Sequence, residues 1–478
     1  MELTFIGYAQ IVLGMLVVIA GNMRHALMLL MASALFNGSA AILLPALGGS
    51  SIPPIQFALA FVFLRILMPG SAAIGDLPEA LKANRMLALF SFYGIATAFI
   101  LPRIFAGSVN VYPMQFNDVA DLFATVPLEP TSQNLTAAFY LLGSLLSAIV
   151  VWIACRRTDA AATMVGTLIV MAWVHSILGL AGIAIRGTSV DAVFELFRNS
   201  AYVQMDDAIG GFVRIRGIFP ESSAYATLGF VLFVANSEMW YRSIRSTATG
   251  LATLVMGTVL FFSTSSTAYL GLAIYGLFFA LRIFALPGAT NFAKAKTAFA
   301  AIGSIIFLSA LLFIASPALV EGVVDVVKRM TIEKSSSDSG MQRLYWAQQG
   351  WDLFRHSYGL GVGPGSFRSS SIFFAMLGSM GVIGILSFLS YLIAAFQPWR
   401  RSSWTESAIP AENLGGALGS AALLSLIPAA VNSPTAVPGV TFVILASASL
   451  ALRPFDLARR IDPFRRAETP VSATTVAQ

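Results

Sequence analysis

Long runs of apolar residues, separated by short polar segments, recur along almost the whole chain. An α-helix needs about 20 apolar residues to cross the hydrocarbon core of a bilayer, and most of these runs approach that length. They predict thirteen membrane-spanning helices, which we place at residues 4–21, 25–46, 54–69, 86–107, 135–155, 161–184, 223–240, 248–263, 266–284, 297–315, 371–396, 415–432 and 436–453. The third run is short and begins at a pair of prolines, so whether it is a full span stays open and the count is twelve or thirteen.

The composition excludes an ordinary soluble protein. Of the 478 residues, 57% are hydrophobic and 11% are charged, whereas soluble domains carry about 25% charged residues. We therefore expect residues 1–478 to form a single all-α, polytopic membrane domain.

The charged residues are divided unequally between the two sides that this helix pattern creates. Connections on one side, together with the C-terminal tail, carry seventeen Lys and Arg against nine Asp and Glu, whereas the other side carries eleven against fourteen. Because Lys and Arg favour cytoplasmic loops, the basic side and the C-terminus are predicted to be cytoplasmic. The net charge of +6 follows from this topology, so we expect a lipid bilayer, and no nucleic acid, as a partner.

The long connections all lie on the opposite, outer side. They cover residues 108–134, 185–222 and 316–370, and long connections between spans tend to carry function. The third is the largest loop, and its pattern predicts an amphipathic helix over 316–330 and a second helix from Met341 to Phe354. We therefore expect an outward-facing site with a helical loop inserted between spans.

Arginines accompanied by glycine and serine mark these outer connections. A planar guanidinium forms paired, charge-assisted hydrogen bonds with phosphate oxygens, and successive backbone N–H groups of a glycine-rich segment can hold an anion. The pattern indicates a phosphate-containing ligand, to which the hydroxyl-rich turn from Ser263 to Tyr269 could also hydrogen-bond. The candidate binding residues are Arg214, Arg355, Gly361, Gly363, Gly365, Arg368 and Ser370, and the charged candidates for catalysis are Arg216 and Arg343.

Two outward residues are candidates for a general base, Glu221 and His356. His356 has the more suitable intrinsic pKa, whereas Glu221 also suits the start of a helix, where the dipole favours a carboxylate. His175 lies inside a span and is expected to hydrogen-bond a neighbouring helix. The outer loops contain no Asp-x-Asp pattern, and the adjacent pair Asp206 and Asp207 resembles solvated acids, so we predict no metal and no cofactor.

Three motifs, in order along the chain, resemble the hallmark segments of the O-antigen ligase/polymerase superfamily. Residues 214–223 read Arg-Ile-Arg-Gly-Ile-Phe-Pro-Glu-Ser-Ser, similar to the arginine motif of that family, and the turn from Ser263 to Tyr269 resembles its short hydroxyl turn. The third motif runs from Arg343 to Gly384 and includes Gly-Leu-Gly-Val-Gly-Pro-Gly-Ser-Phe-Arg-Ser-Ser at residues 359–370. The chain is most similar to the Wzy-type polymerases of exopolysaccharide pathways.

This resemblance implies a GT-C-like, metal-independent, inverting glycosyltransferase on the periplasmic face of the bacterial inner membrane. Its substrate would be an undecaprenyl-diphosphate-linked oligosaccharide, with Arg214 or Arg216 and Arg343 holding the diphosphate, and chain-length regulator and export proteins as further partners. Ligases place a functional histidine after the glycine run, where this chain has three serines, Ser369 to Ser371. That departure argues against a ligase and leaves the base open between Glu221, His356 and a substrate-assisted route.

Three other functions remain as alternatives. One is transfer of the O-antigen ligase type, to a lipid or protein acceptor. Another is a transporter or flippase of lipid-linked sugars, although such proteins usually carry ionisable groups at mid-membrane and the predicted spans hold few besides His175 and Arg65. The last is a non-catalytic partner in polysaccharide assembly.

Overall fold

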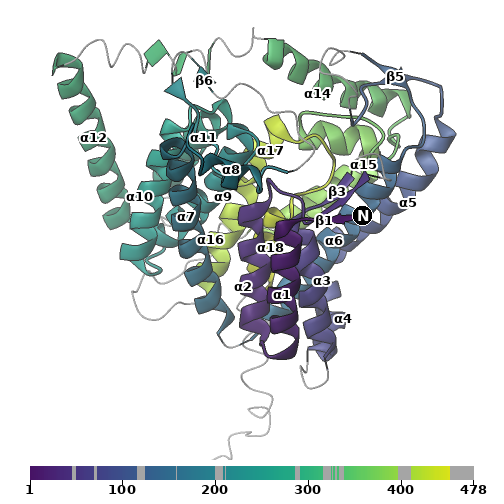
Figure 1. The fold of residues 1–478 in the computed structure, drawn as a ribbon, viewed down its shortest axis with the longest axis horizontal. Coiled ribbons are helices and arrows are strands. Elements are labelled where there is room, and N and C mark those ends of the chain that lie inside the picture. Colours follow the sequence, from purple (N-terminus) through teal and green to yellow (C-terminus); the bar gives the residue numbers. More distant parts are fainter. Residues whose placement is uncertain are drawn as a thin grey trace, which may run out of the picture.

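The computed structural model is a bundle of α-helices with three small β-sheets (Figure 1). It describes residues 1–45, 50–68, 73–115, 124–157, 159–199, 208–209, 212–285, 291–315, 324–325, 327–328, 331–332, 338–396 and 411–452. The longer helices are α5 (Arg85–Ile104), α6 (Ser132–Cys155), α7 (Ala160–Ala184), α9 (Ser222–Tyr241), α10 (Ser246–Phe262), α11 (Ser266–Ala285), α12 (Phe292–Ala315), α14 (Asp338–His356) and α15 (Ile372–Ala395). The shorter helices are α1 (Phe5–Ile19), α2 (Met23–Ser33), α3 (Pro54–Leu67), α4 (Leu77–Ala83), α8 (Asp191–Glu195), α16 (Ala411–Leu424), α17 (Leu426–Asn432) and α18 (Val440–Ala451), with 3-10 turns at Ala34–Phe36 and Ile74–Asp76.

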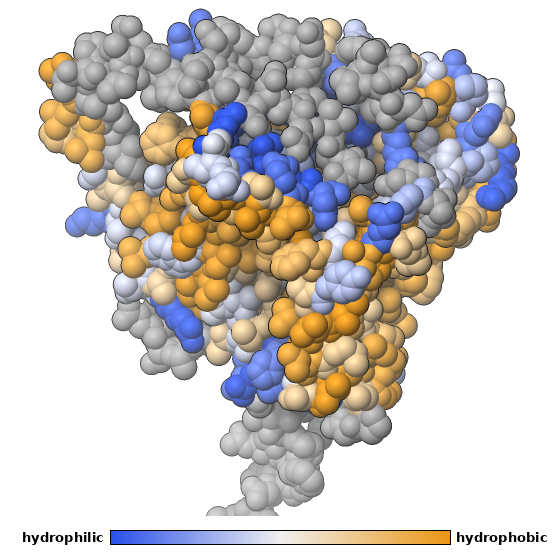
Figure 2. All heavy atoms as spheres, viewed as in Figure 1, coloured by the Kyte–Doolittle hydropathy of each residue, from blue (hydrophilic) through white to orange (hydrophobic). Residues whose placement is uncertain are grey.

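Every one of the thirteen predicted spans overlaps an α-helix, which confirms an all-α polytopic membrane protein. Six helical segments of the described chain are long and apolar enough to cross a membrane: Arg85–Ile104, Ser132–Cys155, Ala160–Ala184, Ser266–Ala285, Ile372–Ala395 and Asn413–Asn432. Five further apolar helices are shorter, at Phe5–Ile19, Met23–Phe36, Pro54–Leu67, Ser246–Phe262 and Val440–Ala451. Figure 2 shows apolar residues spread over the sides of the bundle, where the bilayer would be in contact with them.

The second predicted span was wrong at its end. Helix α2 and its 3-10 turn stop at Phe36, and residues 42–44 form a strand instead of the last helical turns. This strand, β2 (Ile42–Leu44), lies between β1 (Glu2–Leu3) and β3 (Ser50–Ile52) and is antiparallel to both. Apolar side chains alone did not distinguish this buried strand from a continuing helix.

Two helix groups make up the core. Helix α6 is the centre of the first and packs against α3, α5 and α18, while α9 is the centre of the second and packs against α7, α10 and α11. Helix α16 contacts both α9 and α18 and therefore joins the two groups. Helix α14 packs along α15, which in turn packs against α5.

We call one end of the bundle the α14 end, and the opposite end the α4 end (Figure 1). The α14 end also holds the two-stranded sheet of β4 (Asn110–Val111) and β5 (Val126–Pro127), and that of β6 (Ala208–Ile209) and β7 (Phe212–Val213). Most of the amphipathic helix predicted over 316–330 lies outside the described residues, whereas the second predicted helix is confirmed as α14.

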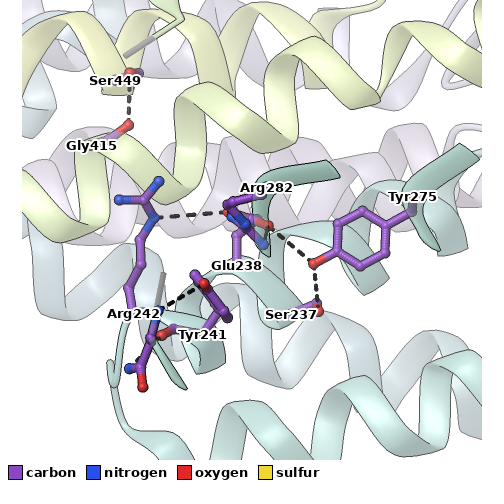
Figure 3. Close-up of polar contacts among 9 residues, drawn as sticks. Ser237, Glu238, Tyr241, Arg242, Tyr275, Arg282, Gly415 and Ser449 are labelled. Carbon is purple, nitrogen blue, oxygen red and sulfur yellow. Dashed lines mark hydrogen bonds and ion pairs between the residues drawn. The ribbon is translucent and has the colours of Figure 1, made fainter. Parts of the chain in front are cut away.

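A buried ion cluster, which the sequence did not predict, lies between α9, α11 and α16 (Figure 3). Glu238 is fully buried and accepts hydrogen bonds from Arg282 Nη1 at 2.8 Å and Nη2 at 3.0 Å, and from the Tyr275 hydroxyl at 3.1 Å. Arg242 Nε lies 3.8 Å from the same carboxylate, and Arg282 stacks over the Tyr241 ring at 3.9 Å. These three charged residues were counted with the charges of one membrane side, but their side chains are buried within the bundle.

Candidate active site

Arg214 and Arg216 lie on the loop between β7 and α9, which we call the arginine loop (residues 214–221). Gly217 adopts a φ of +53°, a conformation that favours glycine. Its backbone packs closely on α7, since a Cβ on Gly182 would lie only 3.1 Å from Gly217 Cα. Arg216 donates through Nη1 to the Pro220 carbonyl at 3.5 Å and lies 3.9 Å from the Glu195 carboxylate.

Glu221 is the residue immediately before α9, as the sequence suggested. Its carboxylate does not cap the helix but accepts a hydrogen bond from Ser223 Oγ at 2.8 Å. The carboxylate therefore stays on the arginine loop, four residues after Gly217.

His175 has the structural role that was predicted for it. Its Nε2 lies 3.1 Å from the Tyr225 carbonyl, the Tyr225 hydroxyl donates to the His175 carbonyl at 3.0 Å, and the two rings stack at 4.0 Å. These reciprocal bonds join α7 to α9 directly below the arginine loop and hold the two helices that support it.

The hydroxyl turn, residues 263–265, connects α10 to α11. Thr264 adopts a φ of +48°, which is unusual for a residue with a branched side chain. Thr264 Oγ1, Ser265 Oγ and, at the start of α9, Ser222 Oγ are buried without a hydrogen-bond partner within the described part of the chain. Buried hydroxyls normally find a partner, so three unsatisfied ones at two helix N-termini indicate a ligand-binding position.

The arginine loop and the hydroxyl turn are neighbours. The Arg214 guanidinium interacts electrostatically with Tyr269, in the first turn of α11. A positive charge, two helix N-termini and free hydroxyls are complementary to a phosphate group.

The second arginine group is built on α14 and on the segment that follows it. The carbonyl of Arg343 accepts a hydrogen bond from Ser370 Oγ at 2.5 Å, so α14 is tied to the start of α15. The Arg368 guanidinium lies over the Trp346 ring at 4.6 Å and donates to the Met114 carbonyl at 3.3 Å. The Arg343 backbone, the Arg368 side chain and Ser370 therefore lie along the same part of α14.

The glycine run, residues 359–365, contacts the protein's own helices. Its four glycines have φ between +84° and +95°. The N–H groups of Gly361, Val362 and Gly363 donate to Ser357 Oγ at 2.7 Å and to the Gly378 and Ser379 carbonyls at 2.8 and 2.9 Å. These N–H groups are thus engaged within the chain and are not available to hold an anion.

The glycine run packs against a break in α15, and this close packing requires glycine. Gly381 has a non-helical conformation inside α15, and the Val382 N–H there donates to the Gly359 carbonyl at 3.0 Å. A Cβ on Gly363 would lie 2.7 Å from the Pro102 ring of α5, and one on Gly365 would collide with the Gln133 carbonyl of α6. The run therefore fixes three helices relative to one another.

Arg355 and His356 lie at the end of α14 and are both exposed. His356 Nε2 lies 3.0 Å from Ser108 Oγ, and its ring contacts Phe105 edge-on. Neither residue makes a described contact with the arginine loop. The pair Asp206 and Asp207 lies outside the described residues, and in the described part no three His, Cys, Asp or Glu side chains gather as for a metal ion.

A series of contacts connects the two arginine groups across the α14 end. The arginine loop packs on Gly38, where a Cβ would lie 2.9 Å from the Pro220 ring, and the chain then continues into β2 and β3. Ser50 of β3 accepts a hydrogen bond from Gln133 at 3.2 Å, and the neighbouring Asn134 donates to the Pro364 carbonyl at 2.8 Å. Both groups therefore belong to the same end of the bundle.

One residue of this region was not selected from the sequence. Arg198, buried just after α8, contacts the arginine loop at Gly217. A single arginine in a long connection gives no recognisable pattern, and only its tertiary contact identifies it.

Residues 251–389 match the model of a family described as O-antigen ligase. The matched segment begins in α10 and ends in α15, so it contains the hydroxyl turn, α14 and the glycine run, whereas the arginine loop precedes it. Comparison with curated proteins gives no match.

Proposed function

We propose, from the membership of this chain in the O-antigen ligase/polymerase superfamily, that it is a polymerase of lipid-linked oligosaccharide repeat units. The family match itself supports a glycosyltransferase-like function of the ligase or polymerase kind. The proposal adds the substrate, an undecaprenyl-diphosphate-linked oligosaccharide, and the product, a longer polymer on the same lipid carrier.

The observation that carries the proposal is the position of Arg214 beside the hydroxyl turn. Transfer breaks the bond between the anomeric carbon and the diphosphate, which leaves with the bonding electron pair. Charge therefore develops on the phosphate oxygens in the transition state, and donors already in place there lower the barrier. Arg214 carries a positive charge beside this turn, and the hydroxyls of Thr264 and Ser265 are buried there without a partner in the described part of the chain. These groups are therefore suited to the task.

Arg343 and Arg368 would contact the same substrate from the α14 side. Their position at the same end as the arginine loop supports this assignment. The lipid carrier presents its diphosphate at the headgroup level, so the α14 end would lie at that level on the periplasmic face of the inner membrane, and the C-terminus would be cytoplasmic.

Glu221 is our candidate for the base. The acceptor sugar hydroxyl attacks the anomeric carbon and must lose its proton, which a carboxylate on the arginine loop can accept. His356 is less suitable, since it is exposed at the end of α14 and bound to Ser108. A carboxylate base and guanidinium donors can carry out this step without a metal ion, and we propose a metal-independent, inverting transfer.

The second candidate is ligase-type transfer, which the description of the matching family favours. The two functions use the same leaving group but differ in acceptor. A polymerase transfers to another lipid-linked unit and yields a ladder of lengths, whereas a ligase transfers to a different acceptor and yields one product from each donor.

The test is reconstitution of the purified protein in liposomes with lipid-linked repeat units and a chelator. A ladder of products on the lipid carrier is expected from the wild type, and Arg214→Gln and Arg343→Gln should each lower its rate by about 10²–10³-fold, as for loss of a transition-state donor. Arg103→Gln, at an exposed arginine near the same end, is the matched control. Full-length polymer from both Arg214→Gln and Arg343→Gln would refute the diphosphate role, and movement of lipid between leaflets without elongation would indicate a flippase.

A further inference from the structure

Arg198 is a buried arginine outside the three sequence motifs. Its side chain is only 2% exposed, and a buried guanidinium is destabilising unless its donors are paired. The groups that pair with its donors therefore indicate the role of this side chain.

The guanidinium of Arg198 holds the arginine loop by a single carbonyl. Nε and Nη2 both donate to the Gly217 carbonyl, at 3.2 and 2.6 Å. Nη1 points to the other side, where it binds Glu195 at 2.6 Å and lies 3.5 Å from Asp191. All three nitrogens are thus used, and the fork geometry that makes this possible belongs to arginine and not to lysine.

The segment that carries Arg198 is itself fixed to the first helices. The Phe197 carbonyl accepts a hydrogen bond from Ser39 Oγ, and Asn199 Oδ1 accepts one from the Ala40 N–H at 2.8 Å. The Phe197 ring also stacks on Phe36 at 5.9 Å. Arg198 therefore connects the arginine loop to a rigid support.

Glu195 extends this connection to Arg216. Its Oε1 binds Arg198 and lies 3.9 Å from Arg216 Nη2, so one carboxylate is shared by two arginines. Gly217, whose carbonyl Arg198 holds, is the residue directly after Arg216. Arg198 thus restrains the backbone of the loop, and Glu195, which Arg198 also binds, restrains the Arg216 side chain.

We propose that Arg198 is a positioning residue, which holds the arginine loop in the shape that Arg214 and Arg216 need in order to bind the diphosphate. This inference rests on the proposed function for its consequence in catalysis, but the restraint on the loop is independent of it. Misplacement of a binding group by about 1 Å can lower a rate about 100-fold, so the effect of losing the restraint should be large.

The experiment compares Arg198→Lys, Arg198→Gln and the wild type by three measurements. Hydrogen exchange of the amides in residues 212–220 reports the order of the loop, thermal unfolding in detergent reports stability, and the rate of polymer elongation reports function. Arg186→Lys, at an exposed arginine of the same connection, is the matched control. Glu195→Gln is a second variant. Its carboxylate is half exposed, so the substitution is not expected to cause a folding defect.

We expect Arg198→Lys to lose exchange protection in the loop and about 10–100-fold in kcat/KM, while its Tm stays within a few degrees of the wild type. Glu195→Gln should lower kcat/KM by a smaller factor, because it weakens the ion pairs with Arg198 and Arg216 but leaves both hydrogen bonds from Arg198 to the Gly217 carbonyl in place. Two results would overturn the proposal: unchanged hydrogen-exchange protection of the loop amides in both Arg198 variants, or an unchanged elongation rate per folded molecule. A purely structural residue would lower only the fraction of folded protein. If the wild type itself forms no polymer, the proposed function is refuted, and the exchange measurement still decides whether Arg198 orders the loop.

Discussion

Removing the charge of Glu238 tests the buried ion cluster most directly. Glu238→Gln keeps the size of the side chain but removes the negative charge that pairs with the guanidinium groups of Arg242 and Arg282. Both cations are almost completely buried, at 7% and 9% exposed. The wild-type carboxylate accepts two hydrogen bonds from Arg282 and one from Tyr275. The change removes the charge assistance from these bonds and replaces one acceptor oxygen by an NH2 donor.

The expected loss can be estimated from comparable buried pairs. Removing one partner of a buried ion pair costs about 3–5 kcal/mol, chiefly because an uncompensated charge stays buried. That is a large fraction of the total stability of a typical domain, about 5–15 kcal/mol. We therefore expect Glu238→Gln to lower the apparent Tm of the detergent-solubilised protein by about 5–15 °C.

Thermal unfolding followed by tryptophan fluorescence is a suitable assay, with the recovery of monodisperse protein as a second measurement. Glu79→Gln, at an exposed carboxylate, is the matched control and should leave Tm unchanged. The double variant Glu238→Gln/Arg282→Gln should recover part of the loss, since one of the two buried positive charges is then removed together with the negative one. A Tm for Glu238→Gln equal to that of the wild type, or a double variant less stable than the single one, would refute the reasoning.

The remaining predictions concern the site and its supports. Gly361→Ala should destabilise the protein by about 1–3 kcal/mol, because Gly361 has a φ of +85° and a Cβ there would lie 2.6 Å from the Met380 nitrogen. Gly75→Ala is the control, since a Cβ there meets nothing within 4 Å, and equal Tm values for the two variants would contradict the prediction. Ser265→Ala removes a buried hydroxyl that has no partner in the described part of the chain. Tm should therefore stay level or rise, while the rate of elongation falls about 10-fold. A fall in Tm with unchanged elongation would show that the hydroxyl is structural. Glu221→Gln should abolish elongation and His356→Gln should not, and the reverse result in the polymerisation assay would transfer the base to His356. Dialysis against a chelator should leave the product ladder unchanged, and loss of the ladder with recovery on addition of Mg²⁺ would disprove metal independence.

Helix positions were predictable from this sequence to within a few residues in most cases. A membrane-spanning segment must satisfy all its backbone hydrogen bonds internally and expose apolar side chains, and both requirements appear in the local pattern. The predicted span 161–184, for instance, corresponds to α7 at Ala160–Ala184. The segment 42–44 was misread because strand and helix bury the same residue types.

Side-chain partners were not predictable in the same way. Glu238, Arg242 and Arg282 are charged residues near predicted span ends, where exposure is the usual outcome, and their pairing depends on how α9, α11 and α16 meet. Arg198 illustrates the same limit, since its partner is a carbonyl with no sequence signature. The glycine run was singled out as a candidate anion site, but its sequence did not show that the N–H groups of Val362 and Gly363 would bind carbonyls of α15.

The close packing of the glycine run restricts how related sequences can diverge. Each alternate residue, from Gly359 to Gly365, meets a different neighbour, so the run works as a spacer of fixed length. A substitution between the glycines changes one contact, whereas inserting or deleting a single residue shifts all later contacts out of register at once. Homologues that share this geometry should therefore vary in side chains around the run while keeping its number of residues constant.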